Sequence, residues 1–323
     1  MRKYIVFGTT ALGQRVMDLL GENGICFCDN RSNRTWISGK RVIRPERLKD
    51  IVNDETAVII ASTNARTINE ISIQLATIDK GICVFPLEDY AGLLVCEDAI
   101  LYSELNNRQS FEREEKYDYC FPMDRFMTAG TITSYFWQDY WAAKRIYSAP
   151  VATHFDIGSR IDGFVSHLMC FGQKVQLIDI RPLDVNLPGV GFQKGDATNL
   201  VEIEDASIES ISALCSLEHF GLGRYGDPID PEACFKCFDA IQRKLKKNGR
   251  LYISVPVGIE HVEFNAHRVF KAETIVKEFD RLNLLEFSSC YKEEYTENVP
   301  IDQYDTWDEK GGNRFGLFLF QKP

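Results

Sequence analysis

The strongest constraint in the sequence is an alternation of apolar strand-like runs with helical periods, which occurs twice along the chain. In the first series KYIVFG, GICFCDN, AVIIAS and GICVFPL are typical of strands, and ARTINEISIQLATI is typical of a helix. The second series begins near Val151 with ATHFDIG and continues through KVQLIDI, VGFQKGDA, SISALCS and GRLYISVPV. Such alternation predicts parallel sheets covered by helices on both faces, so we expect an α/β protein with two sheets.

The chain has 323 residues, which is enough for two domains with separate cores. We predict a small Rossmann-like domain over residues 1–90 and a second α/β domain over residues 151–323. Residues 91–150 are expected to form a helical linker that contains the aromatic run ITSYFWQDYWAAKRIYS. This run predicts a helix that either packs in the core or covers the ligand cleft of the second domain.

Composition excludes several classes of function. A net charge of -10 without a clustered basic face argues against a nucleic-acid partner. Membrane insertion is not expected, since no apolar run approaches the ~20 residues that a span requires. The N-terminal apolar run continues into a glycine turn rather than a cleavage site, so we expect a cytoplasmic protein with reduced cysteines. The CFKC pair lies in an amphipathic helical run without a second pair, so no metal site is predicted.

Acidic residues and glycines follow the strands of the second series, at the sheet edge where open parallel sheets bind ligands. Asp156 ends the first strand, and Gly158 permits a sharp turn whose N–H groups face a ligand. Asp179 ends the second strand and could accept both hydroxyls of a ribose. Asp196 follows the third, where it could read the amino edge of adenine. Glu218, in SLEHF, follows the fourth at the mouth of the same predicted cleft.

The segment EHFGLGRYGDPID, residues 218–230, contains more polar side chains than a simple connection needs, among them Asp227. FNAHR follows the fifth strand, so His267 should approach His219 from a neighbouring loop. Because an unperturbed histidine titrates near neutral pH, we predict His219 as a catalytic base and His267 as the second candidate. The alternative is that His219 and its neighbours only hold the loop together.

Two arginines near these histidines are candidates for binding an anionic part of the substrate, such as a phosphate or a carboxylate. They are Arg224, in the 218–230 segment, and Arg268, in FNAHR.

Together DIGSRIDGF, LIDIRP, GDAT and SLEHF resemble the class I S-adenosylmethionine-dependent methyltransferase superfamily, over about residues 151–323. More closely, IGSRIDGF, DIRPL, EHFGLGRYGDPID, SVPVG and FNAHR are similar to a bacterial and nematode family of unknown function within it. The resemblance implies S-adenosylmethionine as cofactor and a seven-stranded sheet with a terminal antiparallel strand. It also implies a set of cofactor-binding residues: Asp156, Gly158, Ser159 and Gly163 for methionine, Asp179 for ribose, Asp196 for adenine, and Glu218 nearby.

Arg160 and Asp162 depart from the glycine spacing that is usual in such a loop. If their side chains point into the cleft, they crowd the methionine moiety. If they point away, the loop can still hold it.

FGTTALGQRVMDLL and FCDNRSNRTWISGKRVIRPERL resemble the small Rossmann-like domain of bacterial sugar acetyltransferases and other glycan-modifying enzymes. In that family the domain holds a nucleotide-sugar, and Asp29 stands where a Rossmann sheet places an acid for a ribose. The resemblance implies a small-molecule or glycan substrate and a role in polysaccharide biosynthesis. The alternative is a degenerate unit kept for packing or dimerisation, which leaves a homo-oligomer open.

The leading hypothesis is therefore a methyltransferase that acts on a sugar nucleotide or surface-glycan precursor. One alternative is a non-catalytic nucleotide- or partner-binding protein with a methyltransferase-like fold, which the departures at Arg160 and Asp162 favour. The other is a glycan-pathway enzyme of different chemistry that uses the 218–230 loop.

Overall fold

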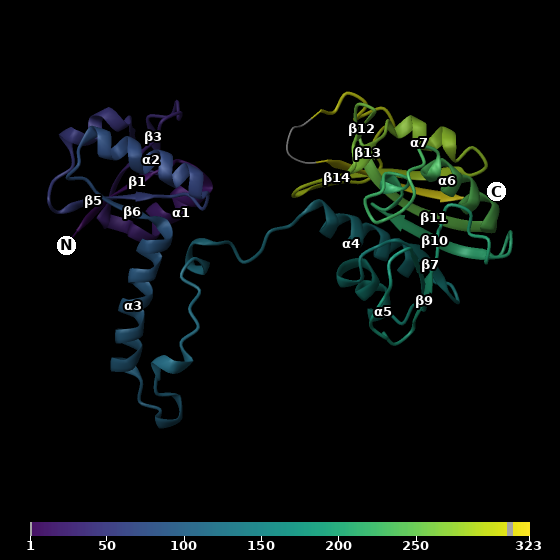
Figure 1. The fold of residues 1–323 in the computed structure, drawn as a ribbon, viewed down its shortest axis with the longest axis horizontal. Coiled ribbons are helices and arrows are strands. Elements are labelled where there is room, and N and C mark those ends of the chain that lie inside the picture. Colours follow the sequence, from purple (N-terminus) through teal and green to yellow (C-terminus); the bar gives the residue numbers. More distant parts are fainter. Residues whose placement is uncertain (1, 309–312) are drawn as a thin grey trace. The chain divides into compact units, whose positions relative to one another are not determined.

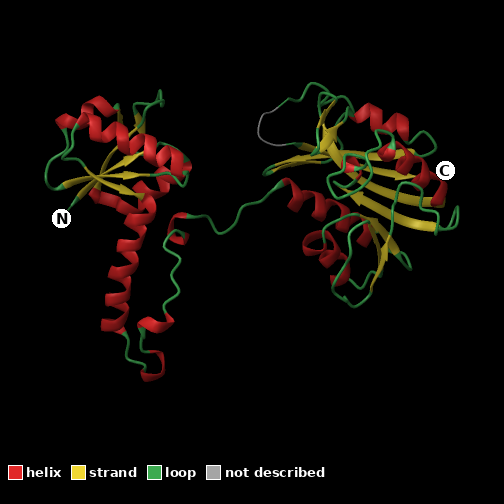
Figure 2. Cartoon of the chain, in the orientation of Figure 1, coloured by secondary structure: helices red, strands yellow, loops and turns green. Residues whose placement is uncertain are grey.

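The computed structural model describes residues 2–308 and 313–323. It divides the chain into two compact units, Met1–Thr131 and Ile132–Pro323. Each unit has its own sheet with helices beside it (Figure 1; Figure 2). The expectation of an α/β protein with two parallel-type sheets is confirmed.

The first unit has a six-stranded sheet in the order β3-β4-β2-β1-β5-β6, in which only the β3–β4 pair is antiparallel. Apolar side chains on one sheet face pack with α1 and α3, and those on the other face pack with α2. The strands are β1 (Lys3–Phe7), β2 (Gly24–Cys28), β3 (Trp36–Ile37), β4 (Lys40–Ile43), β5 (Thr56–Ile60) and β6 (Cys83–Pro86). The helices are α1 (Ala11–Leu20), α2 (Ala65–Ile78) and α3 (Leu87–Leu105).

The carboxylate of Asp29 fastens the loops of this unit to each other. Its Oδ2 accepts hydrogen bonds from the N–H and the hydroxyl of Thr9, at 3.0 and 2.7 Å. Its Oδ1 accepts from the N–H groups of Arg31 and Ser32, both at 2.8 Å. The side chain predicted to bind a ribose therefore has both oxygens engaged by the protein itself.

The second unit is built on an eight-stranded sheet in the order β15-β14-β16-β11-β10-β7-β8-β9. The strands are β7 (His154–Ile157), β8 (Val175–Asp179), β9 (Val190–Lys194), β10 (Ile208–Leu214), β11 (Leu245–Val257), β14 (Asn283–Tyr291), β15 (Glu294–Thr296) and β16 (Arg314–Gln321). A separate hairpin pairs β12 (His261–Glu263) with β13 (His267–Val269). The helices are α4 (Ser134–Tyr147), α5 (Ser166–Cys170), α6 (Ala233–Lys244) and α7 (Ala272–Glu278).

Numbered along the chain without the edge strand β15, the main sheet reads 3-2-1-4-5-7-6. Strand β16, the seventh, is antiparallel to both of its neighbours, while the β7–β8, β8–β9, β7–β10 and β10–β11 pairs are parallel. This is the class I methyltransferase arrangement with its terminal antiparallel strand, as expected from the sequence. The strand order changes direction between β7 and β10, and a crevice opens at this point in sheets of this type.

The region expected to be a linker divides between the two units. Helix α3 belongs to the first unit, whereas α4 packs on the second sheet, with Trp141 and Ile146 fully buried beside Tyr252 and Leu319. The aromatic run is therefore partly core. Its first turn is different, since Tyr135 remains exposed.

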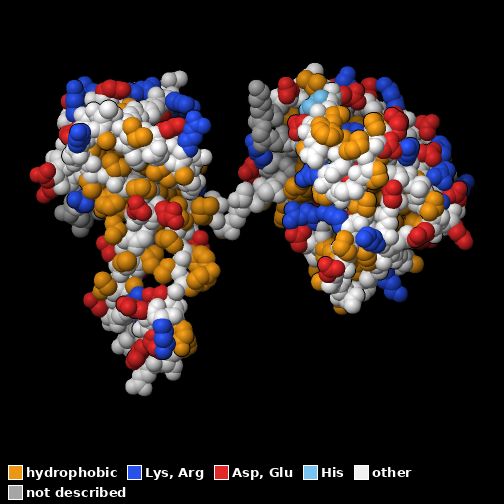
Figure 3. Space-filling view, in the orientation of Figure 1, with side chains coloured by type: hydrophobic (Ala, Val, Ile, Leu, Met, Phe, Trp, Pro, Cys, Tyr) orange, Lys and Arg blue, Asp and Glu red, His pale blue; other side chains and the backbone are white. Residues whose placement is uncertain are grey.

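Apolar side chains also gather on the surface of α3 (Figure 3). Leu93, Ile100, Leu101 and Leu105 are all at least half exposed there. Patches of this kind mark contact surfaces, and the homo-oligomer stays a prediction. Within the described residues, no helix combines the length and the apolar character needed to span a membrane.

We predict that Gly13→Ala destabilises the first unit. A Cβ at Gly13 would lie 2.1 Å from the carbonyl oxygen of Gly8, because α1 crosses β1 at close range. Overpacking against backbone should lower the free energy of unfolding by about 2 kcal/mol or more. Urea denaturation of Gly92→Ala is the matched control, since nothing lies within 4 Å of a Cβ at Gly92 on α3. Equal stability of the two variants would contradict the close packing.

Candidate functional site

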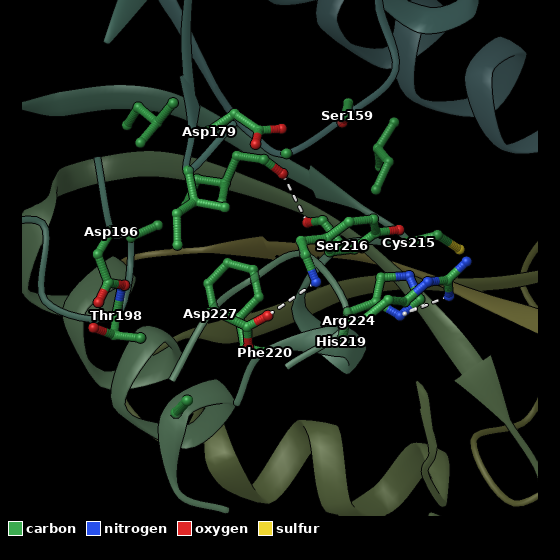
Figure 4. A pocket seen from close by; sticks show the side chains of 18 of the residues that line it. Ser159, Asp179, Asp196, Thr198, Cys215, Ser216, His219, Phe220, Arg224 and Asp227 are labelled. Carbon is green, nitrogen blue, oxygen red and sulfur yellow. Dashed lines mark hydrogen bonds between the residues drawn. The ribbon is translucent and has the colours of Figure 1, made fainter. Parts of the chain in front are cut away.

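A cavity of about 1320 Å³ opens at the carboxyl ends of β7, β8 and β10 in the second unit. Its wall also contains residues 195–199 after β9, much of the 218–230 loop, the beginning of α6 and the first turns of α4. Several residues predicted from the sequence line it: Gly158, Ser159, Gly163, Asp179, Asp196, His219, Arg224 and Asp227. Figure 4 labels Ser159, Asp179, Asp196, His219, Arg224 and Asp227 among them. The predicted residues Asp156, Glu218 and His267 do not line it.

Asp156 is buried beneath the cavity instead of facing it. Its side chain is 0% exposed and accepts hydrogen bonds from the hydroxyls of Ser159 and Ser212 and from the N–H of Ser159. Burial raises the pKa of Asp156 to about 6. Its contacts are thus those of a positioning residue, and the prediction that it touches the methionine moiety is not met in this structure.

His154 completes this buried network. Its ring nitrogens lie 2.8 Å from the hydroxyls of Ser210 and Ser212. Burial lowers the pKa of His154 to about 3, so the ring is neutral.

The loop from Gly158 to Gly163 passes close to its neighbours. Gly158 has φ +70°, and a Cβ there would lie 3.0 Å from the Cβ of Ser216. Arg160 and Asp162 pair with each other at 3.0 and 2.6 Å, and their side chains are 70% and 68% exposed. They stand at the rim of the cavity and leave its interior open.

Asp179 is the last residue of β8, and its carboxylate faces the cavity (Figure 4). Its Oδ1 accepts from the backbone N–H of Arg181 at 2.8 Å and from Nε at 3.0 Å, and its Oδ2 accepts from Nη2 at 2.7 Å. The Arg181 guanidinium also lies over the ring of Tyr225, 4.5 Å from its centroid. A ribose would share Asp179 with this arginine or displace it.

Asp196 and Phe220 mark the other part of the nucleotide-sized space (Figure 4). The Asp196 carboxylate accepts from the N–H of Thr198 at 2.8 Å, in a turn that exposes the side chain to the cavity. Phe220 supplies an aromatic side chain to the wall. Such a ring is suited to pack on a planar base.

Asp227 shapes the 218–230 loop through backbone contacts. Its Oδ2 accepts from the N–H groups of Gly221 and Gly223 at 2.7 and 3.3 Å, and its Oδ1 accepts from that of Tyr225 at 3.2 Å. Gly221 must remain glycine, because φ is +74° and a Cβ would meet the carbonyl oxygen of Asp230 at 1.8 Å. These contacts assign Asp227 to loop structure and not to chemistry.

Arg268 is buried against the same loop, where a substrate cannot reach it. Only 6% of it is exposed, and its guanidinium donates to the carbonyl oxygens of Glu218, Phe220 and Pro231. The prediction that it binds an anion is therefore wrong.

His219 faces the cavity with one nitrogen occupied. Nδ1 lies 2.6 Å from the carbonyl oxygen of Ala266, so it carries the proton, and Nε2 has the free lone pair. Burial, together with the charges of Arg224 and His267, lowers the pKa of His219 to about 4. The ring is therefore neutral at pH 7 and can accept a proton at Nε2.

Arg224 lies beside His219 (Figure 4). Its Nη1 donates to the carbonyl oxygen of Ala266 at 3.1 Å and lies 3.4 Å from His219 Nδ1. No carboxylate lies within ion-pair distance of it in the part of the chain that the structure describes. Of the two predicted arginines, Arg224 is the one able to bind an anion in the cavity.

Glu218 and His267 lie next to His219 without reaching the cavity wall. Glu218 is 2% exposed; its Oε1 is 3.6 Å from His219 Nε2, and its Oε2 has no hydrogen-bond partner. Burial raises the pKa of Glu218 to about 8, so the carboxyl is mostly protonated at neutral pH. The ring of His267 lies 6.2 Å from that of His219, and its Nε2 contacts Glu263 and Asn313.

Among the cavity residues that were not predicted as site residues, three are important for the site: Phe220, Tyr135 and Asp139. Phe220 was inside a quoted motif, but nothing in the sequence showed which side it would face. Tyr135 and Asp139 lie on the aromatic helix α4, and only the alternative in which that helix covers the cleft pointed to them. Among residues 2–308 and 313–323, no group of three or more potential metal ligands comes together.

Comparison with known proteins gives a family of unknown function and a set of distant structural relatives. A family model described as "Caenorhabditis protein of unknown function, DUF268" matches residues 197–308, about a third of the chain. No curated protein matches the chain.

Two solved structures illustrate the structural similarity. A putative methyltransferase from Bacillus halodurans is 16% identical, with a TM-score of 0.42, over 57% of this chain and 99% of its own. The N-methyltransferase NodS from Bradyrhizobium japonicum, in complex with S-adenosyl-L-homocysteine, is 14% identical, with a TM-score of 0.40, over 70% and 97%.

We predict that Glu218 makes the stability of the protein depend on pH. Its folded pKa of about 8 lies above the ordinary 4.5. The folded state therefore keeps a proton that the unfolded state releases, and the free energy of unfolding falls as pH rises from about 4.5 to about 8. Glu218→Gln should remove this component, on the order of a few kcal/mol, in chemical denaturation at a series of pH values. The exposed Glu278→Gln should keep the wild-type slope, and equal slopes in all three proteins would refute the assignment.

Proposed function

We propose that the protein is an S-adenosylmethionine-dependent methyltransferase whose acceptor is a sugar nucleotide or a surface-glycan precursor. The observation that carries the proposal is the cavity at the strand ends of a 3-2-1-4-5-7-6 sheet, with Asp179 at the end of β8 facing it. In an open sheet of this type, nucleotide-like ligands bind where the strand order reverses.

The residues of the cavity fit such a cofactor. The turn at Gly158 has φ +70°, a conformation that favours glycine, and its backbone lines the cavity, while Arg160 and Asp162 stay at the rim. Asp179 would hold the ribose, and Asp196 and Phe220 the adenine. Gly158, Ser159 and Gly163 would border the methionine moiety. When bound, the sulfonium group supplies an activated methyl group.

The residues of the chain then have to orient an acceptor and remove its proton. His219 Nε2 would accept a hydrogen bond from the acceptor O–H or N–H and take up the proton that the acceptor loses. The Nδ1–H bond to Ala266 fixes the ring orientation and keeps the lone pair on Nε2. Protonated Glu218 adds no negative charge that would draw a proton to His219 beforehand.

An anionic acceptor fits the charge distribution at this end of the cavity. Arg224 reaches the cavity without a carboxylate partner among the described residues, and guanidinium groups bind phosphate and carboxylate oxygens well. The volume of about 1320 Å³ exceeds the range of about 300–1,000 Å³ usual for a single small-molecule site. These features support a phosphate-bearing acceptor beside the cofactor, and the sugar nucleotide is the form that the resemblance of the first domain suggests.

One contact favours a second candidate function. Arg181 already bridges both oxygens of Asp179, in the position that a ribose would take. This contact is compatible with a non-catalytic protein whose cavity binds a different nucleotide or a partner. Ligand preference separates the two functions.

We predict that the wild-type protein binds S-adenosylhomocysteine and that Asp179→Ala weakens this binding about 10- to 100-fold, because charge-assisted hydrogen bonds to the ribose are lost. Isothermal titration calorimetry measures both affinities. The control is Asp184→Ala, an exposed aspartate outside the cavity wall. If the wild-type protein binds adenine nucleotides but does not bind S-adenosylhomocysteine at millimolar concentration, the methyltransferase function is excluded and the non-catalytic function is supported.

We predict that His219→Ala retains cofactor affinity but transfers methyl groups about 10²- to 10⁴-fold more slowly, since the proton acceptor is gone. The measurement is release of S-adenosylhomocysteine from S-adenosylmethionine with a panel of nucleotide sugars and glycosyl phosphates. His261→Ala, on the exposed hairpin β12–β13, should behave as wild type. Undiminished transfer by His219→Ala would exclude it as the base.

A further inference from the structure

We propose that Asp139, on helix α4, binds the α-ammonium group of the cofactor's methionine moiety and makes the site selective for ligands that carry this group. The inference rests on the proposed function and assigns to it a residue outside the motifs of the strand ends.

Asp139 lies in the cavity wall beside the glycine loop that follows β7. A Cβ on Gly163 would come 2.3 Å from Asp139 Oδ2, so only a glycine lets this carboxylate sit against the loop. The preceding helix residue, Gln138, is buried and accepts from the hydroxyl of Ser254 at 2.6 Å. The first turns of α4 are therefore anchored to the sheet, and Asp139 is held where the methionine end of the cofactor would lie.

The contacts of Asp139 leave it without a compensating cation. Its hydrogen bond comes from Gln138 Nε2 at 3.2 Å, and within the described ranges no lysine or arginine is at ion-pair distance. Of the six other aspartates in the cavity wall, four are paired with basic side chains. The pairs are Asp162 with Arg160, Asp179 with Arg181, Asp230 with Lys236, and Asp239 with Arg243.

The acid at the end of the first strand cannot take this role. Asp156 is fully buried, and its oxygens accept from Ser159 and Ser212. A cationic ligand group near Gly158–Gly163 therefore finds its carboxylate on α4. The chemistry matches, since an ammonium donates up to three hydrogen bonds and a carboxylate only accepts.

The pKa of Asp139 is consistent with a carboxylate whose cationic partner is supplied by a ligand. Burial raises the pKa of Asp139 to about 6, and the negative charge of Asp162 acts in the same direction. The hydrogen bond from Gln138 and the charges of His167 and Arg160 lower this pKa. A half-buried carboxylate of this kind gains more from an ammonium partner than an exposed one does.

The test compares two ligands and two proteins by calorimetry at pH 7.5. S-adenosylhomocysteine carries the ammonium group, and 5′-methylthioadenosine lacks the whole amino-acid part. Asp139→Asn keeps the size of the side chain and removes its charge. We expect it to lower affinity for S-adenosylhomocysteine about 10- to 100-fold and to leave the affinity for 5′-methylthioadenosine unchanged. Asp184→Asn is the matched control and should bind both ligands as wild type does.

The outcomes separate this inference from the proposed function. Failure of the wild-type protein to bind S-adenosylhomocysteine would overturn both. Equal binding of S-adenosylhomocysteine by wild type and Asp139→Asn would overturn only the role of Asp139. A loss of affinity for both ligands would show that Asp139 acts on the shape of the cavity, and this too would overturn selective recognition. An analogue of S-adenosylhomocysteine with hydrogen in place of the amino group should bind wild type and variant equally, and a difference would contradict the assignment to the ammonium.

Discussion

The buried network around Asp156 fixes the geometry on which the cavity depends. Asp156 and His154 on β7 and Ser210 and Ser212 on β10 lie on neighbouring strands at the point where the strand order reverses. Ser212 donates its only proton to Asp156, so its oxygen must accept from His154 Nε2, and Nδ1 must accept from Ser210. Each polar side-chain atom of this network therefore has a hydrogen-bond partner, and Ser159 is held in position by the same carboxylate. Satisfied networks of this kind are stiff, which suits a loop that has to present backbone to a ligand.

Use of Asp156 in the core has a consequence for the site. An acidic residue at the end of the first strand is well placed for a cofactor contact, but Asp156 is buried. If its side chain turned toward the cavity, its buried hydrogen-bond partners would be left without an acceptor. The acidic function at this end of the cavity then falls to α4. The packing of α4 places this residue: Trp141 anchors the helix in the core, and Asp139, two residues earlier, reaches the cavity.

The sequence predicted the sheets and the positions after each strand, because hydrophobic alternation and glycine turns are local signals. Asp179, Asp196, His219 and Arg224 lie in the cavity wall as this reasoning expected. Burial was not predictable in the same way. Glu218 and Arg268 were predicted at the cleft, yet both are buried, and the Arg268 guanidinium donates to the carbonyl oxygen of Glu218. Asp139 and Phe220 could be assigned to the cavity only from the tertiary structure, because it determines which side of a helix or loop faces the cavity.

The two units contain the same local motif, an aspartate followed two residues later by an arginine, but only in the second unit can its carboxylate become accessible to a ligand. Asp29 and Asp179 each end or follow the second strand of a sheet, and each accepts a 2.8 Å hydrogen bond from the N–H of an arginine two residues on. In the first unit the other oxygen of the carboxylate is held by Thr9, through its backbone N–H and hydroxyl, and rotation of the Thr9 side chain cannot release the contact with its backbone N–H. In the second unit it is held by the exposed side chain of Arg181, which rotation can remove without disturbing the backbone. In the first unit the aspartate of the Asp-x-Arg turn therefore has a structural role, whereas in the second unit its carboxylate is accessible to a ligand. For this reason the second unit is the better candidate for a ribose site.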